Sequence, residues 1–180
     1  MEMHELVPHP DHPPVAVSQI RARITNIDET WLNLHWQIED AGRLVLPPFA
    51  GKGRADRLWR TTCFELFLQP VDGVGYIEIN LSPSERWAAY DFLGYRDDMA
   101  KRPMAREPVC TTRVGQTIAT FDAAVPLAGL PPRPWEVGLC AVIEEIGGIK
   151  SYWALAHPPG EPDFHHPACF TLTLPAPDAA

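Results

Sequence analysis

The fold is decided by residues 61–82, TTCFELFLQPVDGVGYIEINLS, in which two runs of alternating apolar side chains flank a turn sequence. Successive side chains of a β-strand point to opposite faces, so this alternation indicates two strands with one apolar face each. The connecting residues 69–75 supply the Pro, Asp and Gly that tight turns favour. The segment therefore predicts a β-hairpin whose core face carries Phe64, Leu66, Leu68, Ile77, Ile79 and Leu81.

The opposite face of this hairpin carries two acids and an amide, Glu65, Glu78 and Asn80. A hairpin centred on the turn pairs Glu65 with Glu78, and Cys63 with Asn80. Like charges that face each other across a strand pair destabilise it by roughly 0.2 to 1 kcal/mol. We therefore expect a neighbouring cation, a shared proton, a bound metal or the hydroxyls of a ligand to offset the repulsion.

Two interpretations of this acidic face remain open. It is either a solvated outer surface on which an arginine such as Arg96 separates the acids, or the floor of a binding site. Aromatic residues beside the acids, Trp59 among them, favour the binding site. Flat rings next to carboxylate and amide acceptors suit a polar, ring-shaped ligand with an apolar face, and an arginine there can bind a hydroxylated ligand.

The rest of the chain repeats short runs of Val, Ile, Thr and aromatic residues. Twenty prolines and twelve glycines interrupt it, so no long amphipathic helix fits. The strand-like runs are residues 15–24, 30–38, 61–70, 76–82, 87–93, 116–127, 135–145, 151–157 and 169–174. Nine or more strands at this spacing predict an all-β fold, an antiparallel β-sandwich of jelly-roll or immunoglobulin-like type.

Length and composition predict one globular domain. We place it at residues 15–175 of the 180, with a flexible N-terminal segment at 1–14 and a tail at 176–180. The formal charge is −8 without a basic stripe, which argues against a nucleic-acid partner. No apolar run reaches membrane-spanning length and no export signal opens the chain, so we expect a cytoplasmic protein without membrane association. The oligomeric state stays open.

Residues 157–170, HPPGEPDFHHPACF, place three histidines and one aspartate among four prolines. First-row metals accept imidazole and carboxylate ligands, and Asp163 could ligate a metal or orient an imidazole. The spacing matches no compact zinc motif, however, and adjacent His165 and His166 would point in opposite directions. We favour a proline-stiffened loop that brings His157 and His165 to a pocket, supported by Asp163.

Three blocks resemble a known family: RADRLWRTTCFELFLQP (54–70), YIEINLSPSERWAAYDFLGYRDDM (76–99) and SYWALAHPPGEPDFHHPACFTLTL (151–174). They are similar to the DOMON-like proteins, a soluble bacterial group related to DOMON domains and to family 9 carbohydrate-binding modules. The blocks span most of the chain after residue 15. The resemblance implies a β-sandwich whose relatives bind either sugars or haem, and a shared fold leaves the activity open.

The resemblance also implies site residues. In the sugar-binding relatives a Trp before the acidic strand clamps the sugar, the acid accepts its hydroxyls, and polar residues of the next strand complete the floor. Trp59, Glu65, Glu78 and Asn80 match that arrangement. Where the relatives have a second clamping Trp, this chain has Phe164 in its proline-rich loop. Calcium is common in such modules, but no loop dense in oxygen ligands is visible here.

The residues favour a binding module that holds a small polar ligand, such as a sugar, on a concave face. Its expected site is Trp59, Glu65, Glu78, Asn80, Arg96, His157, Asp163, Phe164 and His165. One alternative is a metal-dependent or glycosidase-like hydrolase that uses the same acids and histidines. Binding is favoured over catalysis because the sequence lacks a Ser–His–Asp constellation, a nucleophile elbow and a nucleotide-binding motif.

A second alternative is a haem protein. Haem-binding relatives hold iron with Met and His, which in this chain would be Met99 or Met104 with His157 or His165. Such domains are usually exported modules, and this chain shows no export signal. We therefore predict no cofactor, with haem or a divalent metal as the alternatives.

Overall fold

The computed structural model describes residues 1–177, which form thirteen β-strands and three short 3-10 helices. The strands are β1 (His4–Pro8), β2 (Gln19–Ile27), β3 (Trp31–Glu39), β4 (Gly53–Arg54), β5 (Cys63–Pro70), β6 (Tyr76–Leu81), β7 (Arg86–Phe92), β8 (Ala100–Lys101), β9 (Val109–Val114), β10 (Ile118–Pro126), β11 (Trp135–Glu145), β12 (Ile149–Ala154) and β13 (Leu172–Leu174). The 3-10 helices are η1 (Ala41–Arg43), η2 (Leu58–Arg60) and η3 (Pro167–Cys169). Within residues 1–177, no helix has the length and apolar character needed to cross a membrane.

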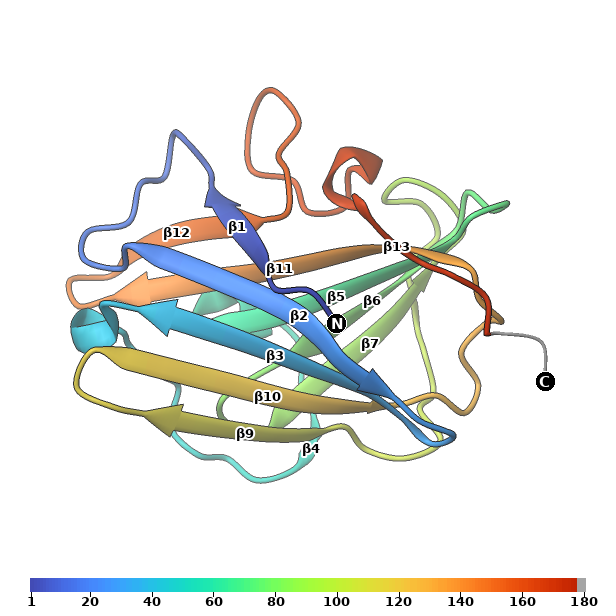
Figure 1. Cartoon of the computed structure of the whole chain (residues 1–180), viewed down its shortest axis with the longest axis horizontal. Helices are drawn as coiled ribbons and strands as arrows, with labels where there is room; N and C mark the ends of the chain where they lie inside the picture. The colour runs from blue at the N-terminus through green and yellow to red at the C-terminus, as the bar shows by residue number, and fades with distance from the viewer. Residues whose placement is uncertain (178–180) are drawn as a thin grey trace.

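The strands form two layers that share β1 (Figure 1). Sheet A has the order β1-β2-β3-β10-β9, and sheet B has the order β4-β7-β6-β5-β11-β12-β1. The short strands β8 and β13 pair with β7 and β11. Among the described strands, only β4 and β7 pair in parallel. The predicted antiparallel β-sandwich is confirmed, with four strands that the sequence pattern missed: β1, β4, β8 and β9.

The core lies between the two sheets because each strand points alternate apolar side chains inward. In β3 the even-numbered residues 32–38 are buried, and the residues between them remain partly exposed. Trp36 lies with its ring centroid 5.4 Å from that of Phe64 on β5, and Phe64 stacks on Phe121 of β10 at 4.2 Å. These rings join the two layers. Trp36 and Trp153, which their apolar strands place in the core, are at most 2% exposed.

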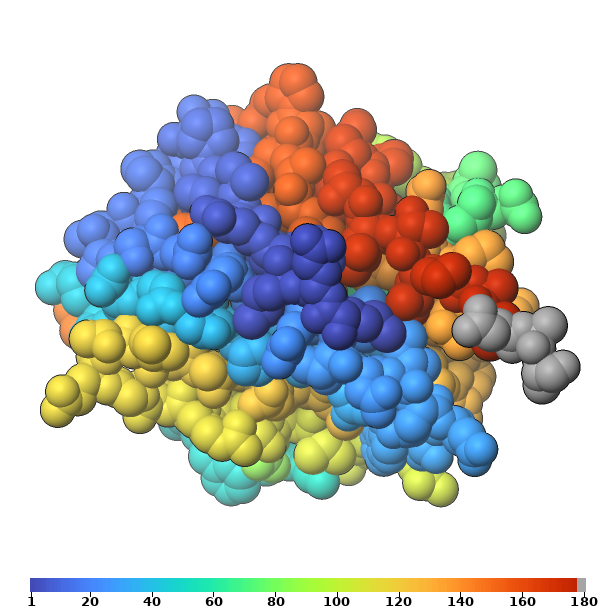
Figure 2. Space-filling model, in the orientation of Figure 1, coloured from blue at the N-terminus to red at the C-terminus, as the bar shows by residue number. Residues whose placement is uncertain are grey.

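The prediction of a flexible N-terminal segment is wrong for residues 4–9. Residues 4–8 are β1, which pairs with both β2 and β12, and His9 is 2% exposed with Nε2 at 2.8 Å from the carbonyl oxygen of Gly160. Figure 2 shows this segment in dark blue against the body of the molecule. The buried carboxylate of Glu145 accepts the backbone N–H groups of residues 15–17 at 2.6 to 3.1 Å. Of the predicted tail at 176–180, residues 178–180 lie outside the described part.

A second apolar cluster covers the outer face of sheet B. Phe164, Cys169 and Phe170 of the loop after β12 pack there on side chains from β5, β6, β7, β11 and β12. The Phe170 ring lies so close to Gly138 of β11 that a Cβ at this glycine would sit 2.8 Å from Cδ1 of the ring. The cluster therefore holds the 155–170 loop beside the strands that carry the acids. All four cysteines are buried free thiols, as their apolar surroundings indicate.

Candidate functional site

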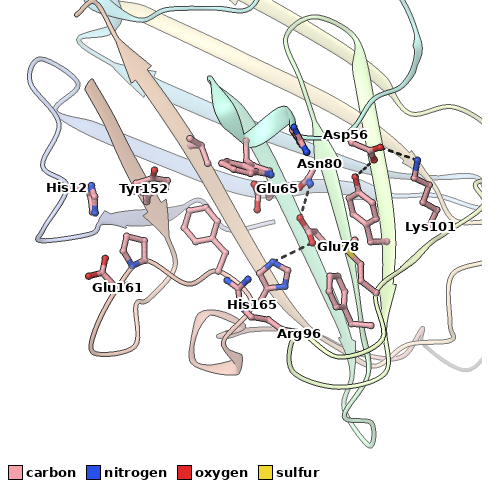
Figure 3. Close-up of a pocket in the computed structure, with 18 residues that line it drawn as sticks. His12, Asp56, Glu65, Glu78, Asn80, Arg96, Lys101, Tyr152, Glu161 and His165 are labelled. Carbon is pink, nitrogen blue, oxygen red and sulfur yellow. Dashed lines mark hydrogen bonds and ion pairs between the residues drawn. The ribbon is translucent and has the colours of Figure 1, made fainter. Parts of the chain in front are cut away.

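A cavity of about 900 Å³ opens on the outer face of sheet B, away from the main core (Figure 3). Its floor comes from β5 and β6, and its walls come from β7, β12, the segment before β5 and the 155–170 loop. Side chains at odd positions of β5 and even positions of β6 point to this outer face, because the even positions of β5 and the odd positions of β6 are in the core. The alternation of the hairpin thus sets the floor.

The floor carries Glu65, Glu78 and Asn80, but the predicted pairing of the two acids is wrong. Glu65 lies opposite Asn80, and Glu78 lies opposite Phe67. The reason is an asymmetric connection: the backbone N–H of Gly73 donates to the carbonyl of residue 70 at 2.9 Å, and residues 74–75 then add length on the β6 side only. A shift of two residues leaves every side chain on its face, so the acids become diagonal neighbours on one surface.

Both acids are buried, so the alternative of a solvated outer face is wrong. Glu65 is 4% exposed and Glu78 is 7% exposed. Burial raises the pKa of Glu65 well above its ordinary 4.5, the charge of Glu78 raises it further, and Arg96 opposes this. Burial also raises the pKa of Glu78, against a hydrogen bond from Asn80 and the charge of Arg96. The pair therefore retains a proton at pH values where exposed glutamates are ionised.

A chain of hydrogen bonds fixes His165 beside Glu78. The backbone N–H of Arg96 donates to the hydroxyl of Tyr76 at 3.1 Å, and that hydroxyl is hydrogen-bonded to Nδ1 of His165 at 2.8 Å. Nε2 of the same ring lies 3.5 Å from Oε2 of Glu78. Oε1 of the same carboxylate accepts from Nδ2 of Asn80 at 2.8 Å. Burial, together with the charge of Arg96, lowers the pKa of His165 to about 4, so the imidazole is neutral at pH 7.

Asp163 lies behind the cavity wall and holds Arg96. Its Oδ1 accepts from Nε and Nη2 of Arg96 at 3.2 and 2.7 Å, and its Oδ2 accepts from the hydroxyl of Tyr95. Burial pushes the pKa of Asp163 upward, but the hydrogen bonds from Tyr95 and Arg96 outweigh it and leave the pKa below its ordinary value. This anchor joins the 155–170 loop to the connection between β7 and β8.

Aromatic rings form much of the wall. Trp59 on η2 is 50% exposed, and Tyr90, Phe92, Tyr152 and Phe164 line deeper parts. Such rings offer flat apolar surfaces beside the polar floor.

Charged pairs and single charges lie at the edges of the cavity. The hydroxyl of Tyr90 donates to Asp56 at 2.6 Å, and Lys101 reaches the other oxygen of Asp56 at 3.1 Å. Figure 3 shows Asp56 and Lys101 on one side of the floor acids, and His12 and Glu161 on the other.

Most of the expected site residues come together in this cavity. Those that line it are Trp59, Glu65, Glu78, Asn80, Arg96, Phe164 and His165. Asp163 does not line the cavity but supports it by holding Arg96 and by accepting the backbone N–H of His165 at 3.2 Å. His157 was expected at the pocket but does not line it: its Nε2 donates to the carbonyl of Val7 at 2.8 Å, and its ring lies 5.1 Å from that of His9. β1 occupies the space beside His157, and the sequence pattern did not indicate that strand.

Several lining residues were not among the expected ones. Tyr90 lies opposite Glu78 in the pairing of β6 with β7, so a second hairpin register would have found it. Tyr152 reaches the cavity through the pairing of β12 with β11, and Lys101 through the two-residue strand β8. Arg57 lies in the segment before β5 with a backbone φ of 61°. Local sequence gives no signal for the placement of Tyr152, Lys101 and Arg57.

The metal and haem alternatives concern His157 and His165. Within residues 1–177, no three His, Cys, Asp or Glu side chains gather as metal ligands would. Met99 and His165 both line the cavity, but Nδ1 of His165 is bonded to Tyr76 and its Nε2 faces Glu78. Both ring nitrogens of His165 therefore have polar neighbours within the chain. The prediction that the protein needs no cofactor stays a prediction.

Comparison with known proteins supports the fold. No family model matches the sequence, and no curated protein matches it. A solved structure of a candidate carbohydrate-binding protein from Bacteroides uniformis is similar, with a TM-score of 0.63, 16% identity, and coverage of 94% of this chain and 84% of that chain. The chain shares this β-fold. A family 9 carbohydrate-binding module from Caldicellulosiruptor kristjanssonii, in complex with cellotriose, is similar with a TM-score of 0.61 and 9% identity, and the match covers 94% of this chain and 80% of that chain. A module of the same family and organism, in complex with glucose, has a TM-score of 0.50 and 10% identity, and the match covers 79% of this chain and 69% of that chain.

Proposed function

We propose that this chain is a carbohydrate-binding module that holds a small sugar in the cavity on sheet B. The supporting observation is the floor. Within residues 1–177 the carboxyl group of Glu65, which lines the cavity, makes no hydrogen bond or ion pair, and Oδ1 of Asn80 opposite it is a buried atom without a partner. A buried polar group without a partner costs about 1–3 kcal/mol. The hydroxyl groups of a bound sugar would recover that cost.

The walls suit the same ligand. A sugar ring has an apolar face and polar edges, and here the half-exposed ring of Trp59 adjoins a polar floor. The cavity volume of about 900 Å³ is within the range of small-molecule sites. The similar proteins in complex with cellotriose and glucose add support from the fold. We further propose that the chain belongs to the DOMON-like group. We also propose that it is a bacterial protein that acts in the cytoplasm without a cofactor.

Calorimetric titration with glucose, xylose, galactose, cellobiose and cellotriose tests this function. We expect at least one of them to bind and to raise the melting temperature, since a ligand at 100 times its Kd stabilises by about 2.7 kcal/mol. Glu78→Gln should weaken that binding about tenfold, because its carboxylate accepts bonds at the floor. Glu29→Gln, on the turn between β2 and β3, makes the same change far from sheet B and should bind normally.

Two results would count against the proposal. One is the absence of heat and of a melting-temperature shift with every sugar in the panel. The other is a Soret band in the purified protein, which would favour the haem alternative instead.

A further inference from the structure

The floor of the cavity presents hydrogen-bond acceptors whose neighbouring donors are already engaged. Nδ2 of Asn80 donates to Glu78, the hydroxyl of Tyr76 serves His165, and Nε2 of His165 faces Glu78. The Glu65 carboxyl lines the cavity and makes no hydrogen bond or ion pair within the described chain, and Oδ1 of Asn80, opposite it, is buried without a partner. A ligand group that donates more hydrogen bonds than it accepts would complement these acceptors once Glu65 is ionised.

The charges at the floor are also unbalanced, with more negative than unpaired positive groups. Two acids, Glu65 and Glu78, lie side by side. Of the cations that line the cavity, Arg57 is exposed, and Arg96 and Lys101 have acidic partners of their own. Arg96 is held by Asp163 at 2.7 Å, and Lys101 is held by Asp56 at 3.1 Å. His165 is neutral at pH 7 because burial lowers its pKa to about 4. Arg96 attracts the acids through space but makes no hydrogen bond to either.

We propose that the ligand of this cavity carries a protonated primary amine that docks on Glu65, as an amino sugar would. A hydroxyl group brings one donor and also acceptors, whereas an ammonium group brings three donors, a positive charge and no acceptor. Charge-assisted bonds of ammonium to carboxylate are about twice as strong as neutral ones. The aromatic wall is compatible with a cation as well, because ring faces attract positive charge.

This inference rests on the proposed function and narrows its ligand class. It also predicts that ligand binding changes the number of protons held by the site. The empty site keeps a proton on the acid pair, and an ammonium ion stabilises the ionised carboxylates, so binding of an amine should release a proton from Glu65 to the solvent. A neutral sugar of the same ring has no such effect.

The test compares three ligands with one ring: glucose, glucosamine and N-acetylglucosamine, titrated at pH 6, where the amine is charged. We expect glucosamine to bind the wild-type protein at least tenfold more tightly than glucose, and acetylation to abolish the gain. In Glu65→Gln the glucosamine-to-glucose affinity ratio should fall to about one, whereas Glu29→Gln should keep the wild-type ratio. Titration in buffers of different ionisation enthalpy should show proton release with glucosamine only.

The outcomes separate this inference from the function on which it rests. Equal affinity for glucose and glucosamine would overturn the amine inference and leave sugar binding intact. A preference for glucosamine that persists in Glu65→Gln would also overturn it, because the attraction would then come from the overall charge of −8. If no sugar of either kind binds, both the inference and the proposed function are wrong.

Discussion

Glu65 stands opposite Asn80 in the pairing of β5 with β6, and this pairing makes the two acids of the floor unequal. The amide of Asn80 donates to Glu78 and leaves Glu65 without a partner in the described chain. Burial then acts on Glu65 with no hydrogen bond to oppose it, whereas Glu78 has one. Glu65 is therefore the acid that favours its protonated form, and Glu78 is the one that is supported as a carboxylate.

Glu65→Gln should stabilise the ligand-free protein at neutral pH. The folded protein keeps a proton on Glu65 that the unfolded chain loses near pH 4.5, so the free energy of unfolding falls as pH rises from 4.5 toward the raised pKa. Each pKa unit is worth about 1.4 kcal/mol. Urea unfolding at pH 4, 5.5 and 7 should give variant and wild type equal stability at pH 4 and a gain in the variant at pH 7. A loss of stability at pH 7 would show that Glu65 is paired.

His165→Gln should change stability at acidic pH, whereas Glu65→Gln changes it at neutral pH. The unfolded chain protonates this histidine below its ordinary pKa of 6.5, whereas the folded protein does so only near pH 4. The wild-type protein thus loses up to about 3 kcal/mol of stability as pH falls from 6.5 to 4, and the variant should lack this loss. The same urea series measures it. Parallel pH profiles for the two proteins would contradict a buried, neutral imidazole.

The faces of the hairpin were predictable and its register was not. Alternation has a period of two, so it assigns Phe64 to the core and Glu65 to the outer face whatever the pairing. For the same reason, alternation is satisfied equally by any even shift. Residues 74–75, which lengthen one side of the turn, decide the shift, and their effect depends on the hydrogen bond between Gly73 and residue 70.

The remaining errors come from contacts between segments distant in sequence. His157 is drawn to β1 by the carbonyl of Val7, and β1 is a strand only because β2 and β12 flank it. Residues 1–14 by themselves have the Pro- and His-rich composition of a loose end. Tyr152 and Lys101 likewise reach the cavity through pairings that no local pattern encodes. Sequence alone therefore identifies the floor of the cavity better than its walls.

Trp59→Ala should weaken sugar binding about tenfold and leave stability nearly unchanged. The side chain is 50% exposed at the cavity, so its removal costs contact with a ligand rather than core packing. Exposed substitutions of this kind usually stay within about 0.5 kcal/mol of the wild-type stability. Calorimetric titration measures the sugar affinity, and thermal unfolding measures the stability. Phe49→Ala, which removes a 75% exposed ring outside the cavity lining, is the matched control. Normal sugar affinity in Trp59→Ala would show that this ring does not take part in binding.

Asp163→Asn should destabilise the protein by about 1 kcal/mol and loosen the 155–170 loop. The change removes the charge that holds Arg96 and Tyr95, and the effect is modest because the Arg96 side chain is about half exposed. The pKa of Asp163 lies below its ordinary 3.8, so the contribution is present above pH 3.8 and fades as pH falls further. Limited proteolysis at pH 7 should cleave the loop faster. Asp72→Asn, on the exposed β5–β6 turn, should not change the cleavage rate.

Gly138→Ala should disturb the outer aromatic cluster and, through it, the site. A Cβ at this position would lie 2.8 Å from Cδ1 of Phe170 and 3.3 Å from Cβ of Phe67. Overpacking of this kind costs about 1–3 kcal/mol. Displacement of Phe170 would reach Tyr76, whose ring centroid lies 5.7 Å away and whose hydroxyl orients His165, so sugar affinity should fall together with stability.

The cost of Gly138→Ala should shrink in a Phe170→Ala background, because the clashing ring is then absent; a double-mutant cycle by urea unfolding measures the coupling. Gly42→Ala is the control, since its nearest neighbour to an added Cβ is a backbone oxygen at 3.8 Å. If Gly138→Ala costs the same with and without the Phe170 ring, the close approach of the two residues does not hold the loop in place. The cluster would then be a separate feature from the site.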